Sequence, residues 1–266
     1  MLDLAPNCYG FWKMNENAAN TDVEDFSSQG NEGTFTDATG NPYTNQHDAT
    51  GKINGALLFD GVDDYINIGT MGDFGSNMNN VTIAVWVKTT VATKSSLYGI
   101  FNDGYNTALN FNVSANSNGY DAYGRLQIYM RDENNSRISG AVDYDTGIAD
   151  GNWHFLVATV QKSLGQINFF VDNSHQTTTY GGSVGTGTDF ANFQYDVFLG
   201  ACSKPDGASK FFAGSLDNFM IFDKALSSDE RSFLWNEGNG RESLSELHRR
   251  LVGGSLAANK RGLVCI

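Results

Sequence analysis

The chain of 266 residues is 40% hydrophobic and 12% aromatic, and it contains 30 Gly but only three Pro. This composition argues against a disordered chain and is typical of many strands joined by tight turns, and all-β domains of this length often form a single unit. The formal net charge of −13 repels a phosphate backbone, so we expect no nucleic-acid partner.

The N-terminal sequence, MLDLAPNCYGFW, lacks the basic and apolar regions of a secretory signal peptide. No run approaches the roughly 18 apolar residues of a membrane-spanning helix, so we expect no membrane insertion. We expect a protein that acts outside a cell or on a virion surface. Two routes stay open: a signal or larger parent chain has been removed, or the protein leaves the cell by a route such as virion assembly and lysis.

Three cysteines, Cys8, Cys202 and Cys265, are widely spaced and form no Cys-x-x-Cys pair. This spacing argues against a zinc site or a redox dithiol. A disulfide between Cys8 and Cys202 requires the fold to bring them together, and we prefer two independent thiols.

Alternating apolar and polar residues mark the predicted strands, which recur at residues 65–68, 81–87, 125–130, 154–160, 166–171 and 196–200. Turn-forming clusters such as Asp60-Gly61 separate these runs. Alternation indicates that each strand buries one face, and two such sheets stacked face to face make a sandwich. The sequence therefore predicts an all-β fold, a two-sheet antiparallel jelly roll. We expect Phe59, Trp153 and Phe219 in its core.

One short helix is predicted over residues 227–238, after the last strand. Ser227 is followed three residues later by Glu230, which makes a capping box. Phe233 and Leu234 follow at helical spacing, and Gly238 is a suitable residue to end the helix.

The composition changes after Gly240. Residues 241–266 carry five basic and two acidic residues, whereas the preceding chain is strongly acidic. We therefore divide the chain into a jelly-roll domain, residues 1–240, and a basic tail, residues 241–266. The spacing of Leu244, Leu247 and Leu251 suggests a short docking helix, and a frayed end is the alternative.

Four segments in a fixed order carry a resemblance to a known family. They are YGFWKMNENAANTDVEDFSSQGNEGTF from residue 9, GKINGALLFDGVDDYINI from residue 51, DGNWHFLVATV from residue 150 and GSLDNFMIFDKALS from residue 214. Together they resemble laminin G-like domains of the concanavalin A-like lectin/glucanase superfamily. The resemblance implies the concanavalin A-like jelly roll with one short C-terminal helix, but function has to be argued from a site.

Catalytic chemistry is disfavoured. Members of this superfamily that hydrolyse β-glucans carry E-x-D-x-E or E-x-D-x-x-E on one strand, because retaining hydrolysis needs two carboxyl groups about 5 Å apart. None of the eight Glu begins such a motif, and Asp143 and Asp145 lie at a predicted turn without a third carboxylate. We interpret His154 as a strand histidine packed under a loop. We therefore predict that the protein is not an enzyme and disfavour a glycoside hydrolase.

A structural calcium ion is the most credible chemistry in this chain, because Ca²⁺ needs about six to eight oxygen ligands and these are easiest to gather where two loops meet. The resemblance implies that the opening loop and the penultimate strand lie together, so Asp25, Asn31, Asp217 and the carbonyl of Gly30 would share one ion that joins the two ends of the domain. In the alternative interpretation, Asp25 forms an Asx turn and Asp217 caps a bend, both without metal.

Asp60, Asp63 and Asp64 form a denser acidic group. Because adjacent strand residues point to opposite faces, we expect that the three do not bind one cation. Asp64 is instead expected to hydrogen-bond backbone groups inside the fold.

Glycan recognition is predicted on two loops. Sugar sites combine an aromatic platform with planar amide, carboxylate or guanidinium groups, because a pyranose has an apolar face and a ring of hydroxyls. Two segments have this composition, FNDGYNTALNF from residue 101 and YGRLQIYMRDENNSR from residue 123. The candidate ligand-binding residues are Asp103, Tyr105, Asn106, Arg125, Tyr129, Arg131, Asp132 and Asn134.

The leading hypothesis is a non-catalytic carbohydrate-binding or adhesion module, stabilised by calcium, whose partner is a glycan or cell-surface polysaccharide. The alternative is a structural virion or surface-fibre (decoration) protein, in which the sandwich contacts other protein subunits and the basic tail anchors it. A starting Met followed at once by the domain favours the alternative or a viral source.

Overall fold

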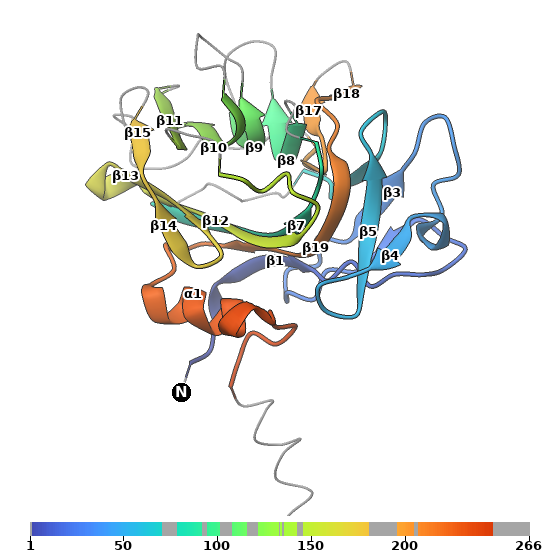
Figure 1. The fold of residues 1–266 in the computed structure, drawn as a ribbon, viewed down its shortest axis with the longest axis horizontal. Coiled ribbons are helices and arrows are strands. Elements are labelled where there is room, and N and C mark those ends of the chain that lie inside the picture. Colours follow the sequence, from blue (N-terminus) through green and yellow to red (C-terminus); the bar gives the residue numbers. More distant parts are fainter. Residues whose placement is uncertain are drawn as a thin grey trace, which may run out of the picture.

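A computed structural model describes residues 2–70, 79–91, 95–101, 108–115, 122–132, 134, 136–142, 146–180, 196–204 and 207–246. The strands in these ranges form two sheets that face each other, with helix α1 (Ser228–Trp235) and the N-terminus below the lower sheet (Figure 1). Four short 3-10 helices accompany them: Ala5–Asn7, Thr44–Gln46, Lys162–Leu164 and Asn236–Gly238. The architecture is the predicted all-β sandwich with one short helix.

The lower sheet in Figure 1, here the first sheet, contains eight described strands in the order β14–β13–β12–β7–β19–β5–β4, with β1 paired to β19. Its pairs are antiparallel. The strands are β1 (Cys8–Trp12), β4 (Asp48–Thr50), β5 (Gly55–Asp60), β7 (Asn80–Lys88), β12 (Trp153–Gln161), β13 (Gln166–Val171), β14 (Ser174–Gln176) and β19 (Ala213–Phe222).

The second sheet contains eleven described strands in the order β15–β11–β10–β9–β8–β16–β6–β3–β2, with β17 paired to β8 and β18 paired to β17. The contact between β17 and β8 is parallel, at one residue pair. The strands are β2 (Asp22–Val23), β3 (Gly33–Thr36), β6 (Tyr65–Asn67), β8 (Ser95–Phe101), β9 (Ala108–Ala115), β10 (Ala122–Arg131), β11 (Arg137–Val142), β15 (Thr178–Tyr180), β16 (Phe198–Leu199), β17 (Cys202–Lys204) and β18 (Gly207–Ser209).

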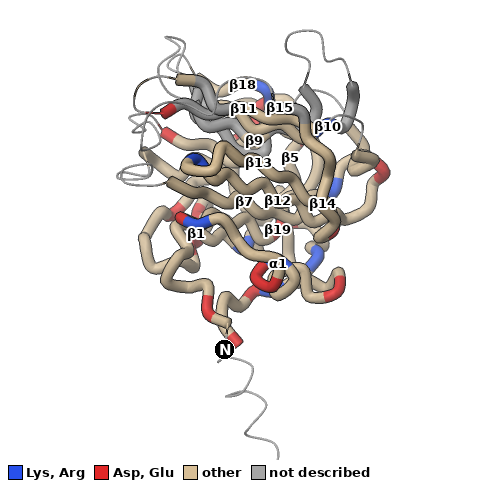
Figure 2. The backbone as a smooth tube through the Cα atoms, turned by 90° about the vertical axis from the view of Figure 1, so that its left-hand side faces the viewer, with Lys and Arg blue, Asp and Glu red and all other residues tan. Residues whose placement is uncertain are grey.

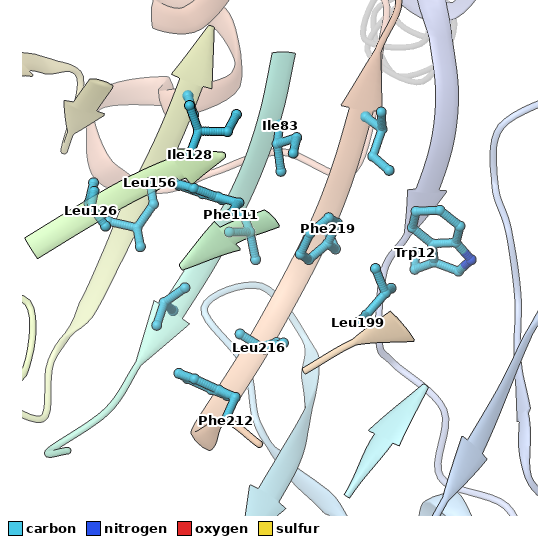
Figure 3. Close-up of a cluster of buried hydrophobic side chains, with 14 of the residues drawn as sticks. Trp12, Ile83, Phe111, Leu126, Ile128, Leu156, Leu199, Phe212, Leu216 and Phe219 are labelled. Atoms are coloured by element: carbon cyan, nitrogen blue, oxygen red, sulfur yellow. The ribbon is translucent and has the colours of Figure 1, made fainter. Parts of the chain in front are cut away.

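The main core lies between the two sheets. Figure 3 shows side chains from β7, β9, β10, β12 and β19 meeting there, together with Trp12 of β1. Phe59 and Phe219 are 1% and 0% exposed, so their predicted place in the core is confirmed. Trp153 is only partly buried and packs on the outer face of the first sheet, so its prediction as a core residue was wrong.

The central strands of the first sheet are buried on both faces, whereas alternation predicted burial of one face. In β7, Val85 and Val87 enter the core between the sheets, while Ala84 and Trp86 enter a second cluster on the outer face. Helix α1 covers that face, and its Trp235 stacks on Trp86 with ring centroids 5.2 Å apart. Because the helix excludes water from the outer face, apolar residues occupy both faces of these central strands.

Helix α1 begins with the predicted capping box. The Ser227 side chain accepts a hydrogen bond from the Glu230 backbone N–H, and the Glu230 side chain accepts one from the Ser227 backbone N–H. The α-helix ends at Trp235, before the predicted Gly238, because Asn236 adopts a left-handed conformation with φ 48°. None of the described helices is long and apolar enough to cross a membrane.

Charged residues concentrate in the connections. In Figure 2 the strands of the first sheet are mostly tan, while red and blue segments gather in the turns and around α1. Cys8 and Cys202 are both buried and are not joined by a disulfide, which agrees with the preferred expectation of two independent thiols.

The first residues of the predicted tail pack on the domain. Leu4 donates its backbone N–H to the carbonyl of Leu244, and Glu246 donates its own to the carbonyl of Leu2. Leu244 also packs against the outer cluster under α1. Residues 241–246 therefore continue the domain past the predicted boundary at 240, and residues 247–266 lie outside the described ranges.

Candidate functional site

Strand β10 presents a polar row on the face of the second sheet that points away from the core. Leu126 and Ile128 are fully buried in the core, so alternation directs Arg125, Gln127 and Tyr129 to the opposite face. Gln127 and Tyr129 are half-buried, and Arg125 is 8% exposed. The row therefore offers an amide and an aromatic ring, with Arg125 largely buried beside them.

The strand register pairs this row with residues of the two neighbouring strands. Tyr129 lies opposite Ser139 of β11 and Asn110 of β9, and Gln127 lies opposite Asn112 of β9. Sequence reasoning placed the candidate residues on loops and omitted Gln127. The alternation of RLQIYM, which predicted the strand correctly, was the signal that places Gln127 beside Arg125 and Tyr129.

The other predicted ligand residues have different positions. Arg131 is the last residue of β10 and pairs with Arg137 of β11. Asp132 is 1% exposed, and it closes the turn after β10 because its Oδ1 accepts the Ser136 N–H at 2.7 Å. Asn134 is exposed in that turn. The predicted residues Asp103, Tyr105 and Asn106 lie outside the described residues.

The Asp25 carboxylate organises the opening loop through hydrogen bonds. Oδ1 accepts the backbone N–H groups of Phe11 and Ser27, and Oδ2 accepts the Ser27 hydroxyl and the Asn31 N–H, at 2.7–2.9 Å. Asn31 in turn donates its side-chain amide to the Tyr9 carbonyl. The predicted loop residues are therefore joined to β1 by donors that fill the Asp25 lone pairs.

Asp217 lies in a different place, at a bulge in β19. It is fully buried, and its carboxylate accepts hydrogen bonds from the Ile53 N–H and the Asn218 amide. Asn218 has φ 50°, and the ladder to β7 is interrupted between Asp217 and Met220. Burial raises the pKa of Asp217 to about 7, although the hydrogen bonds that it accepts favour the ionised form.

A calcium ion shared by Asp25 and Asp217 does not fit these contacts. Trp12 of β1 pairs with Phe219 on one side and with Asp25 on the other, so β1 lies between Asp25 and β19. Two strand spacings, roughly 10 Å, separate them, whereas Ca²⁺ binds its oxygen ligands at about 2.4 Å. The metal-free interpretation, with Asp25 in an Asx turn, agrees with the hydrogen bonds of this loop.

Asp60, Asp63 and Asp64 converge where the chain crosses from β5 in the first sheet to β6 in the second. One carboxylate oxygen from each lies within 4.8 Å of the others. The expectation that they point to opposite faces was wrong, because residues 61–63 form a turn and strand alternation does not apply there. The backbone hydrogen bond expected of Asp64 is present: its Oδ2 accepts the Asp60 N–H at 2.7 Å.

His47 lies on the other side of Asp64. Its Nδ1 is 3.7 Å from Oδ2 of Asp64, and its Nε2 is 3.6 Å from Oδ2 of Asp37. Burial raises the pKa of Asp64 to about 6, with repulsion from Asp60 adding to the rise and His47 opposing it. Asp37, His47 and Asp64 also have ligand atoms within 4.8 Å of one another.

His154 bridges two carboxylates at the start of β12. Its Nδ1 lies 2.8 Å from Asp172, and its Nε2 lies 3.1 Å from Asp150. Burial opposes protonation, but hydrogen bonds to Asp172 and Asp150 outweigh it and raise the pKa of His154. Asp172 also accepts the Phe155 N–H and, with Asn173, has positive φ in the turn between β13 and β14. These contacts fasten that turn to β12.

The family model of the concanavalin A-like lectin/glucanases superfamily, laminin G type, matches residues 60–230. The chain therefore belongs to this superfamily, and the resemblance stated from the sequence is confirmed. A comparison with curated proteins found no match.

Several solved structures share the fold. Domain 4 of AbnA, an extracellular GH43 arabinanase from Geobacillus stearothermophilus solved with arabinotriose, has a TM-score of 0.59 and 15% identity, covering 88% of this chain and 98% of that domain. The botulinum neurotoxin serotype D ligand-binding domain, solved with N-acetylneuraminic acid, has a TM-score of 0.54 and 14% identity over 88% of this chain and 51% of its own. The binding domain of Paraclostridial Mosquitocidal Protein 1 has a TM-score of 0.57 and 16% identity, with 88% and 53% coverage. The chain thus spans about half the length of these toxin domains, and the likeness confirms the jelly-roll fold.

Proposed function

We propose that this protein is a non-catalytic carbohydrate-binding module that binds a glycan on the outward row of β10. The observation that carries the proposal is the succession of Arg125, Gln127 and Tyr129 on one face of a strand anchored in the core by Leu126 and Ile128. A rigid strand holds an aromatic ring beside planar hydrogen-bonding groups, and this combination suits a pyranose or furanose.

The relatives support the same class of ligand. The arabinanase domain, which this chain matches over 98% of that domain's length, was solved with arabinotriose, and the serotype D toxin domain, matched over 51% of its length, was solved with N-acetylneuraminic acid. Those sugars differ in ring size and charge. We therefore infer a glycan or cell-surface polysaccharide as the partner here, with its identity set by the residues around β10.

Binding without cleavage follows from the residue types in the row. Retaining glycoside hydrolysis needs two carboxyl groups about 5 Å apart. Among the described outward positions of β10, residues 125, 127 and 129 are Arg, Gln and Tyr, and none supplies a carboxylate. The proposal places the module outside a cell or on a virion surface, where polysaccharide is accessible.

The first experiment is a glycan array, followed by calorimetric titration of the best ligand. We expect Tyr129→Ala to weaken binding at least about tenfold, or about 1.4 kcal/mol, because it removes the aromatic platform. Tyr43→Ala is the matched control: Tyr43 is a 43% exposed tyrosine before β4, outside the second sheet, and its loss leaves the affinity unchanged. Equal affinity of the Tyr129→Ala and wild-type proteins would reject β10 as the site.

The non-catalytic assignment has its own measurement. The ligand found on the array is incubated with the protein, and new reducing ends are measured. We expect none, and release of sugar by the wild-type protein would make it an enzyme. A protein that binds no glycan but forms a defined oligomer in light scattering would instead favour the structural alternative of a virion or fibre subunit.

A further inference from the structure

The acidic corner, here Asp60, Asp63 and Asp64, has no role in the glycan surface of β10. Gly61 has φ +80°, and Oδ1 of Asp60 accepts the N–H groups of Val62 and Asp63. These hydrogen bonds fold the turn back, so that the three carboxylates converge within 4.8 Å. The turn therefore fixes the positions of three like charges before any ligand is considered.

Two oxygens of the corner are buried without a partner. Asp63 is 9% exposed and Asp64 is 1% exposed, and Oδ1 of each has no hydrogen-bond partner in the described part of the chain. A buried carboxylate oxygen that has lost water and gained no donor is strongly unfavourable. Because the three carboxylates also converge, a positive group at the corner would offset this cost.

His47 does not supply that positive group in its neutral form. Its Nε2 lies 2.9 Å from the Asn41 carbonyl, and a carbonyl only accepts, so Nε2 carries the proton. The Nδ1 that faces Oδ2 of Asp64 at 3.7 Å is then an acceptor. His47 thus presents a lone pair to the corner.

We propose that the acidic corner binds a divalent cation of the calcium type, with Asp60, Asp63 and Asp64 as ligands. Hard cations of this kind take carboxylate oxygens, and Ca²⁺ tolerates irregular geometry with several waters. Asp60 is exposed, which provides the entry path and room for those waters, while the orphaned oxygens of Asp63 and Asp64 provide the buried side. The ion joins β5 of the first sheet to β6 of the second.

The test is a calorimetric titration of the chelator-treated full-length protein with Ca²⁺. We expect one binding site in the wild-type protein and loss of binding in Asp63→Asn. His47→Gln is the control, because it removes the imidazole beside Asp64 and leaves the three carboxylates in place. Absence of Ca²⁺ binding to the wild-type protein, or retention of binding by Asp63→Asn, would overturn the proposal. If His47→Gln loses binding and Asp63→Asn keeps it, the ion binds between Asp37, His47 and Asp64, and the proposal is also overturned.

Thermal unfolding supplies a second signature. Ca²⁺ is expected to raise the Tm of the wild-type protein by mass action and to leave the Tm of Asp63→Asn unchanged. In EDTA we expect Asp63→Asn to melt above wild type, because the variant removes a buried unpaired charge. If Asp63→Asn does not fold by circular dichroism, Asp60→Asn replaces it: Asp60 is exposed, and Asn keeps the Oδ1 that accepts the two turn hydrogen bonds. If the folded variant melts below wild type in EDTA, the three carboxylates do not destabilise the metal-free protein, and the argument for the site is overturned.

Discussion

Replacing Asp217 with Asn should stabilise the protein at neutral pH and remove the part of the stability loss between pH 4 and 8 that Asp217 causes. Asp217 is fully buried on the outer side of β19, where burial raises its pKa to about 7 from an ordinary value of 3.8. Because the folded pKa lies above the unfolded pKa, the native state holds the proton more tightly. The stability contributed by Asp217 is complete below about pH 4 and is lost as the pH rises through 7.

The magnitude follows from the same values. A rise from 3.8 to about 7 corresponds to about 4 kcal/mol at about 1.4 kcal/mol for each pH unit. The asparagine fits the site, because its oxygen can accept the Ile53 N–H as Asp217 does now. The Asn218 amide then turns over and brings its Oδ1, which is buried and unpartnered in the described structure, toward the new amide N–H.

The assay is urea unfolding of both proteins at pH 5 and pH 8, in EDTA and again in excess Ca²⁺. We expect Asp217→Asn to be more stable than wild type by about 2 kcal/mol at pH 5, which lies above the unfolded pKa, and by about 4 kcal/mol at pH 8. Subtracting the two proteins removes the contributions of other titrating groups. A variant that is less stable than wild type at pH 8 would refute the reasoning. If excess Ca²⁺ raises the stability of wild type until it equals that of Asp217→Asn, the ion binds at Asp217.

Three further outcomes are expected. Ser227→Ala should destabilise the domain by about 1 kcal/mol in urea unfolding, because it removes the side chain that caps α1, and an unchanged midpoint would contradict the capping contact. Deletion of residues 247–266 should leave the circular dichroism and Tm unchanged, whereas deletion of residues 241–266 should lower the Tm, because it removes the backbone pairing of Leu244 with Leu4. His154→Gln should flatten the decline of stability above pH 6.5, because the raised pKa of His154 makes the protonated form stabilising and that contribution is lost as the pH rises; equal slopes for variant and wild type would reject it.

Elements with a local sequence signal were predictable from the sequence. The alternation in residues 166–171 and the capping box at Ser227 and Glu230 lie where they were predicted, because both signals are local and need only a few neighbouring residues. The double-sided burial of β7 was not predicted, since the apolar run VTIAVWV shows burial but not what covers the outer face. The outer face is covered by α1, whose Trp235 stacks on Trp86 and lies far along the chain from β7.

The sequence by itself therefore determined the superfamily, the sandwich and the helix start, because each depends on local pattern and on the spacing of strands. The tertiary structure decided which carboxylates meet. It placed β1 between Asp25 and Asp217, which separates two residues that the family pattern united. It also brought Asp60, Asp63 and Asp64 together, because a turn with positive φ at Gly61 cancels the alternation that a strand would impose.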